Sequence, residues 1–122
     1  MPSFPKPDPG LVERVDAILS TYPARRRPMF GTTSWFLESN EQMFAGVWGD
    51  GLTARVGAEE ALRLARSGEV EAFDPMGGRP MKEYVLVPAD RIEEDADLEA
   101  WVGRAARFAD GLPPKRRSSD PA

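Results

Sequence analysis

Apolar residues recur between residues 11 and 22 with the spacing of a single helical face. They occupy positions i, i+1, i+4, i+7, i+8 and i+11, which are Leu11, Val12, Val15, Ile18, Leu19 and Tyr22. Asp8 is placed to be the N-cap and Pro9 the first helical residue, and Pro23 ends the pattern. The spacing therefore predicts a first helix with one buried face.

Two further segments have helical spacing. The stretch "AEEALRLARSG" begins with acidic residues, ends with arginine and has Gly68 as its C′ residue, as a helix requires. Near the C-terminus one face repeats apolar side chains at Leu98, Trp101, Val102, Ala105, Phe108 and Ala109. We expect three helices in all.

The intervening segments are short and rich in aromatic or β-branched residues. "MFGTTSWFL" (29–37), "QMFAGVWG" (42–49) and "LTARV" (52–56) are separated by turn residues and predict a three-stranded antiparallel meander. "VEAFDP" (70–75) and "EYVLVP" (83–88) read as two more strands. The last strand of the meander alternates apolar and polar residues, so one face should be buried and the other wet.

The order α-βββ-α-ββ-α predicts an α+β fold of two layers. A five-stranded antiparallel sheet should carry its helices packed on one face. The core should contain Val15, Ile18, Val47, Val85, Val87, Trp101 and Val102.

The length of 122 residues suits one compact domain. Residues 1–8 are proline-rich and predict a flexible N-terminal arm, and residues 9–111 the single domain. Residues 112–122 contain little to bury and predict a disordered C-terminal tail.

Composition narrows the chemistry. Cysteine and histidine are both absent, which removes thiolate nucleophiles, disulfides, Cys-based metal sites and the commonest general base. We expect no enzyme, no metal site and no cofactor. The net charge of −4 argues against direct nucleic-acid binding. No apolar run is long enough for a membrane span, and the N-terminus lacks the apolar core of a secretory signal, so a cytoplasmic location is expected.

The segment "FDPMGGRPM" (73–81) contains the most unusual motif, the pair Gly77-Gly78. One interpretation is structural: the glycines adopt positive φ and reverse the chain between two strands, with Arg79 over the neighbouring sheet. This would bring its "RPM" near the earlier "RPM" at residues 27–29. The other interpretation is a backbone nest for an anion, formed by Gly77, Gly78 and Arg79.

Three further groups each allow two interpretations. The run Arg25-Arg26-Arg27 is expected in a solvated loop before the first strand, but Arg27 could join Arg79 and Lys82 in binding phosphate or an acidic protein. The aromatic residues of the meander are expected in the core rather than on a base-stacking platform. The internal methionines are expected to be adaptable core filler: Met29, Met43, Met76 and Met81.

An ordered set of short motifs resembles a known family. "RRPMFG" (26–31), "MFAGVWGDGL" (43–52), "FDPMGGRPMKEYVLVP" (73–88) and "LEAWV" (98–102) together resemble the N-terminal domain of the TfoX/Sxy family, over roughly residues 10–110. The resemblance implies a two-layer α/β arrangement with an antiparallel sheet, and it supplies no catalytic residues. Competence regulators of this family carry a second, helical domain, whereas we expect this chain to be a standalone domain.

Two functions remain open from the sequence. The first is a non-catalytic regulatory or protein-interaction module whose partner is another protein. The alternative is a small anionic-ligand-binding domain that uses the Gly77-Gly78-Arg79 turn with Arg27 and Lys82. An exposed apolar patch beside the sheet would favour the first, and a closed polar pocket at the glycines the second. The oligomeric state is left open.

Overall fold

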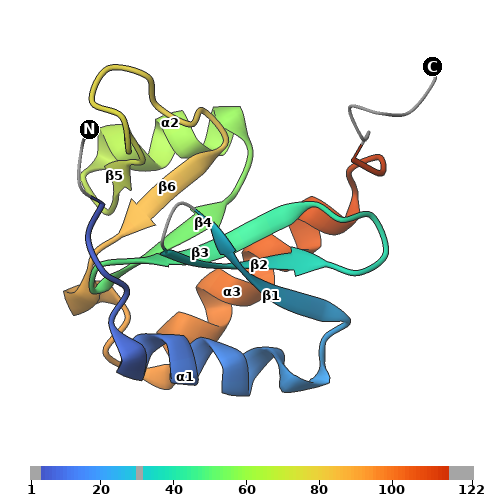
Figure 1. The fold of residues 1–122 in the computed structure, drawn as a ribbon. Helices are drawn as coiled ribbons and strands as arrows, with labels where there is room; N and C mark the ends of the chain where they lie inside the picture. The colour runs from blue at the N-terminus through green and yellow to red at the C-terminus, as the bar shows by residue number, and fades with distance from the viewer. Residues whose placement is uncertain (1–3, 30–31, 116–122) are drawn as a thin grey trace.

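The computed structural model describes residues 4–29 and 32–115. Within them, three α-helices and six strands follow one another in the order shown in Figure 1. The helices are α1 (Pro9–Ile18), α2 (Ala58–Ser67) and α3 (Asp95–Asp110), and two 3-10 turns span Leu19–Thr21 and Ala89–Arg91. The strands are β1 (Ala24–Met29), β2 (Thr32–Leu37), β3 (Met43–Trp48), β4 (Gly51–Arg55), β5 (Glu71–Ala72) and β6 (Tyr84–Val87).

The strands form one antiparallel sheet in the order β1-β2-β3-β4-β6-β5. Helix α3 lies across β3 and β4, α1 packs beside α3, and α2 packs on β5 and β6 (Figure 1). The helices therefore cover one face of the sheet, and the predicted α+β class is confirmed.

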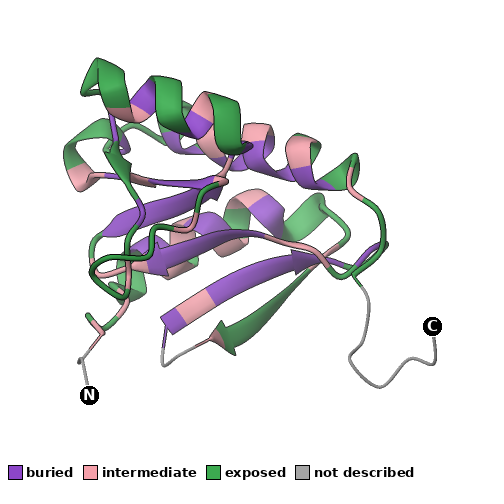
Figure 2. Ribbon diagram, turned by 90° about the horizontal axis from the view of Figure 1, so that it is seen from above, coloured by how far each residue is buried: buried purple, intermediate pink, exposed green. Residues whose placement is uncertain are grey.

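The hydrophobic core lies between the helices and the sheet. Leu98 and Val102 of α3 and Val15 of α1 have no exposed surface, and they pack against buried strand residues (Figure 2). Five of the seven predicted core residues are buried, but Ile18 and Trp101 are only partly buried. The ring of Trp101 lies beside the Arg104 guanidinium, 5.6 Å from its carbon, which places this indole at the margin of the core.

The prediction of five strands was wrong by one, because the arginine run forms a strand and not a loop. Every residue of β1 pairs with β2, from Ala24 opposite Leu37 to Met29 opposite Thr32. This strand is the edge of the sheet, where exposed charged side chains discourage pairing with other chains. Residues 30 and 31 of the predicted first strand lie outside the described residues.

Two element boundaries also differ from the sequence prediction. The first helix ends at Ile18 and tightens into the 3-10 turn before Tyr22, which is 36% exposed. The segment 70–75 supplies only the two paired residues of β5, because its chain turns away before Pro75. Asp8 precedes α1 with extended backbone, but its side chain makes no capping hydrogen bond.

Helix α2 is tied to α3 by one carboxylate. Glu60 accepts hydrogen bonds from Arg63 in its own helix and from Arg104 in α3, at 2.7 and 2.6 Å. The hydrogen bond from Arg63 is the largest cause that lowers the pKa of Glu60 to about 2, and Arg104 adds to it. The ion pair therefore persists at any pH near neutrality.

Parts of the predicted arm and tail lie against the domain. The Asp8 N–H donates to the Gly49 carbonyl at 2.8 Å, and the Phe4 ring lies 5.0 Å from that of Trp48. At the other end, Gln42 Nε2 donates to Pro113 O at 2.7 Å. Residues 1–3 and 116–122 lie outside the described residues.

Candidate binding site on the open face of the sheet

The sheet face opposite the helices, called the open face below, is built from one continuous cross-strand row. Successive partners in the pairing register share a face, so the row runs through all six strands. Its members are Arg27, Ser34, Gly46, Thr53, Leu86 and Glu71. The centre of this row is small and polar, which leaves room above it.

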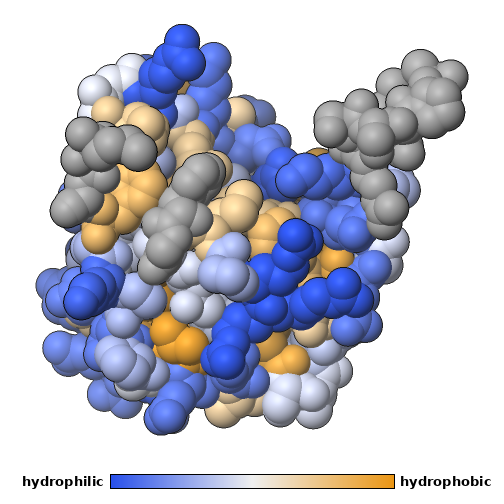
Figure 3. All heavy atoms as spheres, viewed as in Figure 1, coloured by the Kyte–Doolittle hydropathy of each residue, from blue (hydrophilic) through white to orange (hydrophobic). Residues whose placement is uncertain are grey.

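A cavity of about 270 Å³ lies over that centre, and its walls are apolar. We call it the methionine pocket, because four of the chain's five methionines line it. The main apolar walls are Met29, Met43, Met76, Met81, Trp48 and Phe73. Figure 3 shows orange, apolar surface among blue, hydrophilic surface on the side of the molecule seen in Figure 1.

The expectation that these methionines fill the core was wrong. None of the four belongs to the buried core, and Met76 is 59% exposed. The core is filled instead by branched and aromatic residues, which hold defined rotamers. The flexible thioethers gather where the sheet has no helix to cover it.

The pocket floor is formed by Gly46 and two hydroxyls. A β-carbon at position 46 would lie 2.8 Å from Thr53 Oγ1 and 3.0 Å from Ser34 Oγ, so only glycine leaves this space open. Ser34 and Thr53 are 5% and 6% exposed. Neither hydroxyl has a hydrogen-bond partner among the described residues. Among the described residues, every side-chain oxygen or nitrogen that is fully enclosed has a hydrogen-bond partner. Because these two hydroxyls have none, they are not fully enclosed, and both open onto the pocket.

A chain of aromatic rings borders the pocket. Trp48 lies between Phe4 of the N-terminal segment and Phe73, with ring centroids 5.0 and 5.1 Å apart. Phe73 in turn lies 6.4 Å from Tyr84. The predicted core position therefore holds for Trp35 and Phe44. Phe36 is also buried, but it lies on the open face under the Arg27 guanidinium, and Trp48 lies on the pocket.

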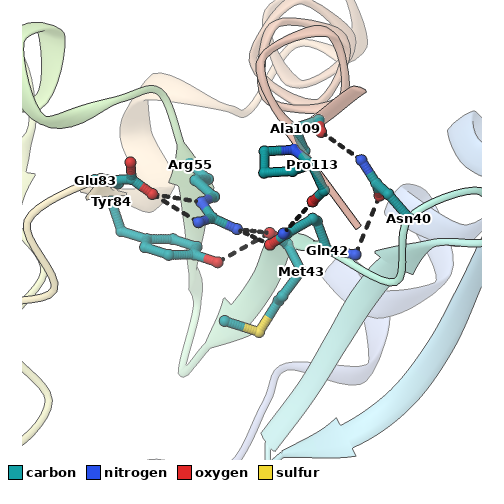
Figure 4. A network of polar contacts seen from close by, with 8 residues as sticks. All are labelled: Asn40, Gln42, Met43, Arg55, Glu83, Tyr84, Ala109 and Pro113. Atoms are coloured by element: carbon teal, nitrogen blue, oxygen red, sulfur yellow. Dashed lines mark hydrogen bonds and ion pairs between the residues drawn. The ribbon is translucent and has the colours of Figure 1, made fainter. Parts of the chain in front are cut away.

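A polar network fixes the backbone beside the pocket (Figure 4). The Met43 carbonyl accepts hydrogen bonds from Tyr84 Oη at 3.0 Å and from Arg55 Nη1 at 3.1 Å. Arg55 is held by Glu83 at 2.8 Å, and burial raises the pKa of Tyr84 to about 12. The Met43 side chain extends away from these polar groups in Figure 4, so a rigid backbone carries a flexible pocket wall.

The same network joins the sheet to the end of α3. Asn40 Nδ2 donates to the Ala109 carbonyl at 2.8 Å, and its Oδ1 accepts from the backbone N–H of Gln42 at 3.2 Å. The turn between β2 and β3 is therefore anchored to the helix layer.

The glycine pair adopts the backbone expected of it. Gly77 and Gly78 have φ values of 67° and 130°, and a β-carbon at either would meet nothing within 4 Å. Conformation, and not crowding, therefore requires glycine here. The carboxylate of Asp74 accepts hydrogen bonds from the N–H groups of Gly78 at 2.8 Å and Arg79 at 3.1 Å. The chain's own anion already occupies the nest that the sequence suggested.

The predicted site residues are not brought together. Arg79 lines the methionine pocket, whereas Lys82 lies beside α2 and the Arg27 guanidinium stacks on Phe36 at 4.9 Å from its centroid. Met29 and Met81, from the two "RPM" segments, do line the same pocket.

The sequence prediction missed the floor of the pocket. The available signal was Gly46, a glycine inside a strand pattern, which indicates a bulge or a close approach. Thr53 was expected on a wet face and is instead nearly buried there.

The described residues also bear on metal binding and on membrane insertion. Within the described part of the chain, no three aspartate or glutamate side chains lie close enough together to bind a metal ion. None of the helices in this part of the chain is long and apolar enough to cross a membrane.

The fold and the site together define an α+β domain with a one-sided helix layer and an apolar pocket on the open sheet face. Comparison with protein families matches residues 18–109 to the TfoX N-terminal domain. This match spans most of the chain, and the chain belongs to that family. Comparisons with curated proteins and with solved structures found no match.

Proposed function

We propose that this chain is a non-catalytic regulatory module that binds another protein through its open face. The observation that carries the proposal is the methionine pocket, an apolar concavity on the sheet face that the helices leave uncovered. Among the described residues that line it, Met76 is the one large apolar side chain that is exposed, at 59%.

The composition of this face is that of an interaction surface. Methionine, aromatic residues and arginine are enriched at protein interfaces, and flexible thioethers adapt to differently shaped partners. Trp48 and Met76 supply partly exposed apolar area, and Arg79 stands at the pocket with Arg25 and Arg27 on the adjoining edge strand.

The two carboxylates that flank the glycine turn support a non-catalytic role. They are Asp74 and Glu83. Asp74 is engaged by two backbone N–H groups and Glu83 by Arg55, so each already has a structural task. General acid–base chemistry needs a group placed to exchange protons with a substrate.

The anion-binding alternative is less favoured, because Asp74 fills the nest, Lys82 lies beside α2 and the Arg27 guanidinium stacks on Phe36. An inorganic anion would have to displace a tethered carboxylate.

Site-specific crosslinking in cells tests the proposal. A photoreactive amino acid is placed at Met76, on the pocket, and in a matched variant at Leu62, an apolar residue of α2 that is 53% exposed. We expect a discrete crosslinked protein from position 76 that is absent from position 62. It should disappear when Trp48→Ala is added, because the aromatic wall is lost. Equal crosslinking from both positions, or none from position 76, would contradict the proposal.

A further inference from the structure

We propose that the methionine pocket binds a small amphipathic carboxylate. Its apolar body fills the pocket, its carboxylate pairs with Arg79 at the mouth, and an uncharged hydroxyl or carbonyl oxygen at its far end reaches Ser34 and Thr53. This goes beyond the proposed function, since it requires no partner protein.

The two hydroxyls at the floor carry the argument. Each hydroxyl opens onto the cavity and has no partner in the described part of the chain, so its hydrogen-bonding capacity is available to a ligand. The open face keeps Ser34 and Thr53 side by side across Gly46, both facing one cavity. A ligand hydroxyl between them would accept from one and donate to the other, and a ligand carbonyl oxygen would accept from both.

The walls set the body of the ligand. With six apolar side chains around it, the cavity favours aromatic or aliphatic groups over sugars or phosphates. At about 30 Å³ for each water-sized group, about 270 Å³ holds roughly nine such groups. A phenol with two methylenes has this size.

Arg79 sets the orientation. Its side chain is exposed, and among the described residues its guanidinium has no ion pair or hydrogen bond. Its backbone N–H is fixed by Asp74, which holds the residue at the pocket. A carboxylate at the floor would exchange its hydrating water for only two neutral hydroxyls, which is unfavourable. At the mouth the carboxylate remains hydrated and also pairs with the Arg79 guanidinium. The charged end therefore lies outward.

Calorimetry on the full chain with three probes tests this assignment. The parent probe is 3-(4-hydroxyphenyl)propanoate. The second, 3-phenylpropanoate, lacks the oxygen for the floor, and the third, tyramine, replaces the carboxylate by an ammonium. We expect the second to bind up to about tenfold more weakly, the value of one hydrogen bond. Tyramine should bind more weakly still.

Variants identify the residues responsible. In Ser34→Ala/Thr53→Val the first two probes should bind equally, and the melting temperature without ligand should not fall. Arg79→Gln should remove the preference for carboxylate over ammonium, and the matched exposed arginine variant Arg66→Gln should keep it.

Several results would overturn the assignment. One is that no probe binds. Another is that the preference for the phenol hydroxyl survives in Ser34→Ala/Thr53→Val and the preference for the carboxylate survives in Arg79→Gln. A third is that tyramine binds as tightly as the parent probe. If position 76 still crosslinks a protein while no probe binds, the ligand assignment fails and the interaction proposal stands.

Discussion

The two faces of the sheet are built from the same strands and differ in almost every physical respect. Beneath the helices, branched side chains of β3, β4 and β6 are buried in one hydrophobic core with side chains of α1 and α3. On the open face, β3 presents a glycine, β2 and β4 each present a hydroxyl without a partner among the described residues, and flexible thioethers surround the cavity. Packing on one face supplies the stability that lets the other face remain incompletely packed.

A period of two residues separates these roles along each strand. In β3, Val47 is 1% exposed in the core, while its neighbours Gly46 and Trp48 belong to the pocket. In β4, Leu52 and Ala54 are core residues and Thr53 lies between them on the floor. A shift of one residue in register would exchange the two faces.

The largest expected effect separates the faces by stability. Leu98→Ala, at a position with no exposed surface, should lower the free energy of unfolding by about 2–5 kcal/mol, because it leaves a cavity in the core. Met76→Ala, at 59% exposure, should change it by less than about 0.5 kcal/mol. Urea unfolding of both variants measures the difference. Similar losses would mean that the open face is part of the core.

Next in size is a pH effect at Tyr84, which lies on the open face and is nevertheless buried. Burial raises its pKa to about 12, and an unfolded tyrosine ionises near pH ~10. Because folding favours the neutral phenol, this stabilisation is complete below the unfolded pKa and is lost as pH rises toward the folded one. We expect on the order of 2 kcal/mol to be lost over that range. Urea titrations should show that the difference in free energy of unfolding between the parent and Tyr84→Phe becomes smaller as the pH rises through this range. A difference that does not change with pH would show that this phenol is solvated.

A smaller effect is expected at the turn. Gly77→Ala should destabilise by about 1–2 kcal/mol, because alanine is disfavoured at a φ of 67°. Gly10→Ala, within α1, is the matched control and should stabilise by up to about 1 kcal/mol. Thermal melts compare the two. A neutral Gly77→Ala would show that the turn adopts another conformation in solution.

The smallest effect concerns the nest. Asp74→Ala frees two backbone N–H groups, so millimolar phosphate should raise the melting temperature of this variant and leave the parent unchanged. Asp90→Ala, an exposed aspartate outside the turn, serves as the control. Stabilisation of the parent by phosphate would restore the anion-binding alternative.

Most of the covered face could be predicted from the sequence. The helical spacing of Leu98, Val102 and Ala105 indicates a buried helix face, and all three are fully buried. The edge strand was missed because three consecutive arginines hide its pairing pattern, which depends on β2 and not on burial. Trp101 was predicted as core, and its place beside Arg104 at the margin could not be inferred from periodicity alone.

Little of the pocket could be predicted, because it depends on contacts distant in sequence. Met29, Met43 and Met81 converge only after three strands pair and the 73–83 loop folds back, with the Met81 N–H donating to the Phe73 carbonyl. The glycine motif was read correctly as a turn with positive φ. The role of Asp74 in filling it required the side-chain geometry.

Nuclear magnetic resonance of methyl-labelled protein tests the central claim, that binding takes place on the open face, most directly. Methionine methyls report on the pocket, and those of Ile18 and Ile92 report on the helix-covered side. On addition of 3-(4-hydroxyphenyl)propanoate, we predict saturable shifts of the Met29, Met43, Met76 and Met81 signals with both isoleucine signals unmoved. Unmoved methionine signals, or equal shifts on both faces, would contradict the account.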